Sequence, residues 1–214
     1  MYKAKDFSHL LGGKLKGLSD SLLEMHFTLY KGYVKNTNNL IKALEDMKQN
    51  DQGRTLAFGA LKRRFGWEYD GMRLHELYFG NLGKKVELSP KSDLYKQIVR
   101  DFGSYEKWRR DYLSTGLIRG IGWVILYRDP IQGHLFNVWV NEHDLGHLAG
   151  GMPLLVMDVW EHAYITEYGL DRAKYIDMFM YNIDWKVIER RYKDSSCFSK
   201  YTVDAKDIEK KSAI

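Results

Sequence analysis

The segment from Asp158 to Tyr164, with the sequence DVWEHAY, places a carboxylate and an imidazole four residues apart. Side chains at this spacing can converge on one metal ion. A donor set that mixes carboxylate oxygen with imidazole nitrogen suits iron, manganese or zinc better than copper(I) or calcium. The segment therefore predicts a metal centre, provided that other parts of the chain supply further ligands.

Two of the seven histidines lie where they can complete such a site. A single histidine on a helix is usually structural, so each alone is weak evidence. His26 lies on the apolar side of the first helical pattern, and His75 lies on the second. An antiparallel hairpin of these helices can bring the two imidazoles face to face. A buried carboxylate at a strand end is costly unless it is paired or metal-bound, which favours Asp158 as a ligand.

The secondary structure that must position these residues is predicted to change from helices to strands near residue 120. Helical spacing of apolar residues predicts a first helix from about residue 19, a polar turn at 49–53, a second helix to about 82, and, after Pro90, helices at 94–102 and 105–118. Apolar runs predict strands at 122–127, 135–140 and 153–158, and helices return from 160 to 191.

The expected fold class is α+β. An N-terminal antiparallel helical hairpin, residues 1–88, precedes a mixed domain, residues 89–193, with helices and a small three-stranded antiparallel sheet. Residues 194–214 are polar, lack a clear apolar face and are predicted to form a tail.

Charge and composition restrict the partners. The 33 basic residues exceed the 28 acidic residues by 5, and they are dispersed, which is weak evidence for nucleic-acid binding and fits attraction of a small anion. Cys197 is the only cysteine, so no intrachain disulfide can form. No apolar signal core and no run of eighteen apolar residues is present. We expect a cytoplasmic protein that binds neither membrane nor nucleic acid.

Five segments in the same order resemble the iron/manganese superoxide dismutase family over roughly residues 6–192. They are Leu23–Leu40 with Tyr33-Val34 and Asn39-Leu40, the His-x-x-aromatic-aromatic-x-Asn-Leu pattern at 75–82, Gly120-Ile121-Gly122-Trp123, the complete 158–164 signature, and Asn182-Ile183-Asp184-Trp185. Five ordered segments are much more specific than any one motif.

The resemblance implies a ligand set for one iron or manganese ion per chain, with water or hydroxide as the fifth ligand. The four protein ligands would be His26, His75, Asp158 and His162. It further implies an enzyme in which one superoxide reduces the metal from +3 to +2 and leaves as dioxygen. A second superoxide reoxidises the metal and leaves as hydrogen peroxide.

The resemblance also assigns the surroundings. Trp123, Trp160 and Phe79 would line the metal pocket, and Tyr33 would stand at its entrance. Glu161 resembles the glutamate that bonds a ligand histidine across the interface, which implies a homodimer or homotetramer.

The group that bonds the metal-bound solvent is less obvious, because family members use a Gln, or in some branches a His, and no Gln occupies the corresponding segment. Counted without gaps, Glu142 takes the Gln position and His147, eleven residues before Asp158, takes the His position. We prefer His147, since a neutral imidazole can donate whereas a glutamate adds negative charge. His143 is interpreted as a residue of a polar turn.

The first helix departs from the family pattern. His26 and Tyr33 are seven positions apart, whereas the family usually has eight. The missing residue predicts a regular α-helix without a π-bulge and a slightly displaced tyrosine. The relay histidine of the family is absent, with Leu29 or Tyr30 in its place, and Ile165 replaces its usual tyrosine partner across the interface.

The choice of metal rests on two residues. Val156 stands two residues before Asp158, where manganese-using relatives often carry Gly, and His147 differs from the Gln of manganese-specific branches. Together they favour iron, with use of either metal next. The alternative function is a metal-binding family member whose altered surroundings have abolished dismutase activity.

Overall fold

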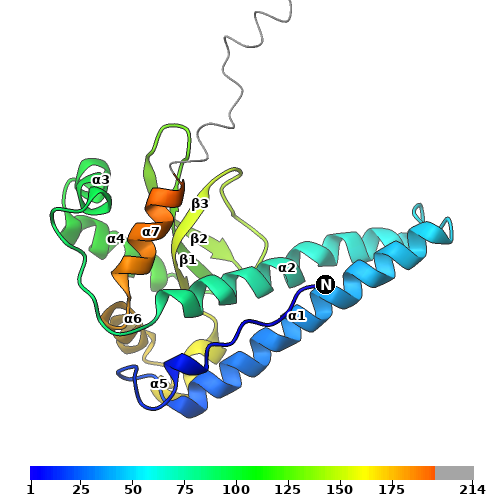
Figure 1. The fold of residues 1–214 in the computed structure, drawn as a ribbon, viewed down its shortest axis with the longest axis horizontal. Helices are drawn as coiled ribbons and strands as arrows, with labels where there is room; N and C mark the ends of the chain where they lie inside the picture. The colour runs from blue at the N-terminus through cyan, green and yellow to red at the C-terminus, as the bar shows by residue number, and fades with distance from the viewer. Residues whose placement is uncertain (196–214) are drawn as a thin grey trace, which may run out of the picture.

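The computed structural model describes residues 1–195 (Figure 1). Nearly all of the predicted tail lies outside these residues. Its expected start at residue 194 is too early, because Asp194 and Ser195 form the end of the last helix and Ser195 is buried.

The N-terminal part is the predicted helical hairpin. After a short turn, η1 (Ser8–Leu10), the chain forms α1 (Asp20–Gln49) and α2 (Leu56–Asn81). The hydroxyls of Ser19 and Thr55 accept hydrogen bonds from backbone amides in the first turns and so begin the two helices. α1 is α-helical throughout, which confirms the prediction of a regular helix without a π-bulge. Figure 1 shows the hairpin projecting well beyond the sheet.

The predicted three-stranded antiparallel sheet is confirmed. Strands β1 (Gly122–Arg128), β2 (Leu135–Asn141) and β3 (Met152–Asp158) pair in the order β2-β1-β3. In the β1–β3 register Trp123 lies opposite Asp158. β1 begins at Gly122, and this residue must be glycine because a Cβ here would clash with the carbonyl oxygen of Val140. The sheet thus fixes an aromatic ring beside the candidate carboxylate ligand.

Helices cover the sheet and make up the rest of the described residues. They are α3 (Asp93–Phe102), α4 (Tyr105–Gly116), η2 (Glu161–Ala163), α5 (Ile165–Tyr168), α6 (Arg172–Tyr181) and α7 (Trp185–Ser195). α4 packs against β1 and β2, whereas α2 and α7 pack against β3. One apolar core joins the hairpin, the sheet and these helices. Within residues 1–195, no helix combines the length and the apolar character that crossing a membrane requires.

Arg191 joins three elements at the strand that carries Asp158. Its guanidinium, on α7, donates to Asn81 Oδ1 at 2.6 Å, to the Leu154 carbonyl at 2.7 Å and to the Leu77 carbonyl at 3.1 Å. Asn81 in turn donates to the carbonyl of Val156. The end of α2, strand β3 and α7 are therefore held together by directional hydrogen bonds as well as by apolar packing.

We expect Arg191→Ala to lower the free energy of unfolding by on the order of 3 kcal/mol, because it leaves buried acceptors without a charged donor. Arg190→Ala is the matched control: this side chain is exposed, so its loss should change stability by less than about 0.5 kcal/mol. Urea denaturation of both variants in the same metal state measures the difference. Equal stabilities would mean that apolar packing alone holds the junction.

Candidate metal centre

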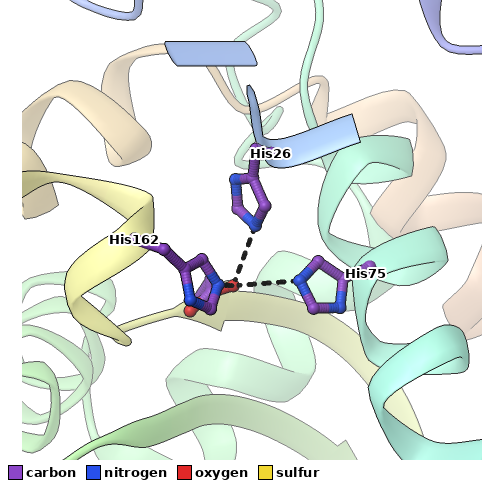
Figure 2. A group of neighbouring side chains, drawn as sticks. His26, His75 and His162 are labelled. Atoms are coloured by element: carbon purple, nitrogen blue, oxygen red, sulfur yellow. Dashed lines mark hydrogen bonds and ion pairs between the residues drawn. The ribbon is translucent and has the colours of Figure 1, made fainter. Parts of the chain in front are cut away.

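Four side chains from four separate elements converge in the interior. His26 lies in α1, His75 in α2, Asp158 at the end of β3 and His162 in η2. Figure 2 shows the three imidazoles pointing toward a common centre. The Nε2 atoms of His26, His162 and His75 lie 3.2, 3.1 and 3.7 Å from Asp158 Oδ2. The four possible ligand atoms all lie within 4.8 Å of one another.

His75 carries the clearest sign of a missing ligand. Its Nδ1 lies 2.6 Å from the carbonyl oxygen of Gly71, and because a carbonyl only accepts, Nδ1 must carry the proton. Nε2 of the neutral ring is then unprotonated and carries a free lone pair. This atom is buried and has no hydrogen-bond partner among the described residues. Buried polar atoms are rarely left unpaired, so a cation at this point fits the residues present.

Charge balance in the cluster also fits a metal ion. Burial lowers the pKa of both His26 and His75, which keeps these imidazoles neutral and able to coordinate. Burial by itself raises the pKa of the Asp158 carboxyl, but His162 and His26 outweigh it and hold that pKa below its usual range. Three neutral nitrogens and one carboxylate are donors that iron and manganese accept.

Second-sphere contacts orient the aspartate. The backbone amide of Trp160 donates to Asp158 Oδ1 at 2.9 Å, which leaves Oδ2 facing the imidazoles. The Tyr175 hydroxyl donates to the backbone carbonyl of Asp158 at 2.7 Å and fixes the strand end. Hydrogen bonds of this kind set the direction of a metal ligand before the metal binds.

Aromatic rings form the walls of the cluster, as the resemblance implied. The ring centroids of Trp123 and His75 lie 5.1 Å apart, those of Phe79 and His26 4.9 Å, and those of Trp160 and His162 5.8 Å. Tyr33 stacks on His75 with centroids 5.2 Å apart. A Cβ on Gly71 would come within 2.6 Å of the Tyr33 ring, so glycine is needed for this packing.

Known proteins are similar to this chain in sequence. Residues 90–191 match the family model described as the C-terminal domain of iron/manganese superoxide dismutases. The chain is 38% identical over 183 residues to the iron superoxide dismutase of Cupriavidus metallidurans, covering 84% of this chain and 90% of that protein. It is 34% identical over 197 residues to the Aquifex aeolicus iron enzyme (90% and 92%), and 35% identical over 180 residues to a Haloarcula marismortui manganese enzyme (83% and 87%).

The chain belongs to the iron/manganese superoxide dismutase family. The resemblance read from five sequence segments is thereby confirmed. Both iron and manganese enzymes are among the relatives, so membership of the family does not decide the metal.

Within this superoxide dismutase chain, His143 occupies the place beside Tyr33. Its Nε2 lies 2.7 Å from Tyr33 Oη, and Trp123 Nε1 donates to its Nδ1 at 3.1 Å. Its ring stacks on Trp160 with centroids 4.8 Å apart and meets the edge of Trp67 at 5.0 Å. His143 does lie in a turn, as interpreted from the sequence, but its side chain is fully buried rather than exposed to solvent.

The structure places His147 and Glu142 differently from the sequence prediction. His147 is separated from the ligand cluster by His143: its ring is hydrogen-bonded to the Tyr127 hydroxyl and to the backbone carbonyl of His143. The backbone of Glu142 is left-handed, with φ of 52°, and its carbonyl accepts from Trp160 Nε1 at 3.4 Å. Counting residues back from Asp158 failed because the loop between β2 and β3 is not extended.

Sequence reasoning also missed Trp67, although a signal was available. Trp67, Gly71 and His75 follow one another at four-residue steps and so share a face of α2. For His143 the signal lay in the pairing of β1 with β2: Gly122 lies opposite Asn141, so a residue shortly after Asn141 must lie near Trp123.

We expect His75→Ala and His162→Ala to abolish metal retention, because each removes one of four protein donors and leaves the Asp158 charge poorly compensated. His134→Ala is the control, since this exposed imidazole pairs with Asp101 away from the cluster. Elemental analysis after desalting measures metal per chain. The ligand set is refuted by equal metal content in all three variants.

The stability of the metal-free chain should fall as pH falls from about 6.5 to about 4. Burial lowers the pKa of His143 from 6.5 to about 4, so the unfolded chain takes up a proton in this range that the folded chain does not. This histidine alone contributes roughly 3 kcal/mol above pH 6.5, and the contribution is lost as pH drops toward 4.

Denaturant midpoints between pH 4 and pH 8 measure the effect. His143→Gln should flatten the profile in part, because His26 and His75 shift in the same direction and remain. A flat profile in the unmodified metal-free chain would contradict the buried neutral state of His143.

Proposed function

We propose that this chain converts two superoxide anions to dioxygen and hydrogen peroxide at one iron ion, held by His26, His75, Asp158 and His162. The observation that carries the proposal is the unpaired, buried Nε2 of His75 within a cluster of four donor atoms. The family assignment supports the reaction, since the iron and manganese relatives named above are superoxide dismutases.

The chemistry that the metal supplies when bound is alternating one-electron oxidation and reduction between the +3 and +2 states. The protein residues set the conditions for it. Three neutral imidazoles and a single carboxylate would together add one negative charge to the metal ion. The net charge of the centre would then stay modest, so that both oxidation states remain reachable. The aromatic walls limit the water around the centre, and in such surroundings electrostatic interactions are stronger than in bulk water.

Proton supply is the second task, because hydrogen peroxide takes up two protons. Trp123 Nε1 can only donate, so His143 Nδ1 must accept and the neutral ring carries its proton on Nε2. That proton is donated to Tyr33 Oη. The hydroxyl hydrogen of Tyr33 therefore remains free to be donated toward the pocket.

The environment of Tyr33 keeps this hydrogen in place. Burial, with a contribution from the Asp158 charge, raises the pKa of Tyr33 to about 12, so the phenol stays protonated at neutral pH. We therefore propose Tyr33, which the resemblance placed at the pocket entrance, as the catalytic proton donor, with His143 rather than His147 as the histidine that bonds its hydroxyl.

Iron is proposed over manganese on two grounds. Val156 is fully buried in β3, two residues before Asp158, and its carbonyl is held by Asn81. Its side chain leaves less room behind the aspartate than the glycine of many manganese-using relatives. The relatives with 38% and 34% identity named above are iron enzymes. Use of either metal is the second possibility.

The assembly and location remain proposals. Glu161 is exposed and Ile165 is 45% exposed next to the ligand His162, as residues of an interface between subunits would be in an isolated chain. We propose a homodimer or homotetramer formed through this face. The single cysteine supports a cytoplasmic location.

The deciding experiment is to strip the metal, reload separate samples with iron or manganese, and measure the dismutation rate per bound metal. We expect the iron form to be faster, because Val156 stands where many manganese-using relatives carry glycine. Comparable rates would mean that either metal serves. A much faster manganese form would overturn the iron assignment, and a fully loaded but inactive protein would select the alternative of a metal-binding member without activity.

A further inference from the structure

His147 is a half-buried histidine that the proposed mechanism does not use. Its Nε2 lies 2.8 Å from the carbonyl oxygen of His143, and because a carbonyl only accepts, Nε2 must carry the proton. The Nδ1 of the neutral ring is then an acceptor. The Tyr127 hydroxyl lies 2.6 Å from Nδ1 and donates to it. Nε2 also lies 3.7 Å from the Asp70 carboxylate, which likewise favours a proton on this nitrogen.

The backbone on both sides of His143 needs such support. Glu142 and Gly146 have φ of 52° and 104°, and glutamate is disfavoured in this region. Asn141 and Leu145 bond each other's backbone at 2.8 and 3.3 Å, which closes a tight turn that has His143 at its centre. Strained backbone of this kind persists only where surrounding contacts impose it.

Tyr127 supplies a fixed anchor for that turn. It lies in the central strand β1, opposite Phe136 of β2 and Pro153 of β3, and only 3% of its surface is exposed. A hydrogen bond from Tyr127 to His147 therefore ties the loop to the rigid centre of the sheet. The direction of this bond also selects the tautomer of His147 that can hold the carbonyl of His143.

We propose that His147 is a positioning residue, which Tyr127 holds in one tautomer so that its Nε2–H fixes the backbone of His143 and thereby the bond from His143 to Tyr33. The inference rests on the proposed function, in which His143 and Tyr33 act together. His147 itself touches neither the ligand cluster nor the substrate. Its effect on the reaction passes through the conformation of the loop.

Matched variants separate positioning from simple packing. The amide nitrogen of glutamine reaches about as far as imidazole Nε2, whereas that of asparagine reaches only to the place of Nδ1. His147→Gln can therefore still donate to the carbonyl of His143, and His147→Asn cannot. Tyr127→Phe removes only the tautomer-selecting hydroxyl and keeps the ring in the core. His134→Asn is the control at an exposed histidine.

The first measurement is amide hydrogen exchange of peptides covering residues 141–151 in the full-length, metal-loaded protein. One lost hydrogen bond should raise exchange by about fivefold to tenfold in His147→Asn, and in the same direction but less in Tyr127→Phe. His147→Gln and His134→Asn should match the unmodified chain. Unchanged exchange in both His147→Asn and Tyr127→Phe would overturn the proposal, and so would equal increases in His147→Gln and His147→Asn.

The second measurement is a double-mutant cycle on kcat with Tyr33→Phe. If His147 acts through the contact between His143 and Tyr33, His147→Asn should lower kcat in the unmodified chain and have little further effect in the Tyr33→Phe background, at unchanged metal content. Independent, additive losses would refute the positioning role. A loaded but inactive unmodified chain would refute the proposed function instead, and the exchange measurement would still report whether His147 holds the loop.

Discussion

The rest of the site depends on a single buried charge, the carboxylate of Asp158. A charge in the protein interior is costly unless opposite charge or hydrogen bonds compensate it. Here the Trp160 amide holds one carboxylate oxygen, and imidazoles from α1, α2 and η2 surround the other. α1 and α2 are far from β3 in the chain, so compensation of Asp158 links the helical hairpin to the sheet domain. The same arrangement also brings together four side chains whose atoms could coordinate one metal ion.

The central strand β1 connects this charge to the groups that handle protons. Trp123 lies opposite Asp158 in one ladder and opposite Val140 in the other, and its indole nitrogen donates to His143. Tyr127, four residues along the same strand, contacts His147. Thus one strand sets the positions of both histidines of the loop. In the neutral rings, the Trp123 indole N–H, which only donates, and the His143 carbonyl, which only accepts, set the tautomers of His143 and His147, and the two tyrosine hydroxyls take the remaining roles.

The four side chains of the candidate ligand set could be picked out from the sequence because their signals are local. The four-residue spacing of Asp158 and His162, the apolar strand before them and the helical periodicity around His26 and His75 were each visible without a structure. The seven-residue step from His26 to Tyr33 likewise predicted the regular helix that α1 forms. His143 was misassigned because its role depends on a turn with left-handed residues, whose shape no periodicity reports.

The sequence by itself determined the fold class, the family and the four residues proposed as metal ligands, since apolar periodicity and motif spacing are properties of neighbouring residues. Tertiary structure alone decided which histidine meets Tyr33. That choice depends on strand register and on the path of the loop after β2, which bring Trp123, Tyr33 and His143 together from three segments. Contacts between distant segments arise from packing of the whole chain, and counting residues along it cannot recover them.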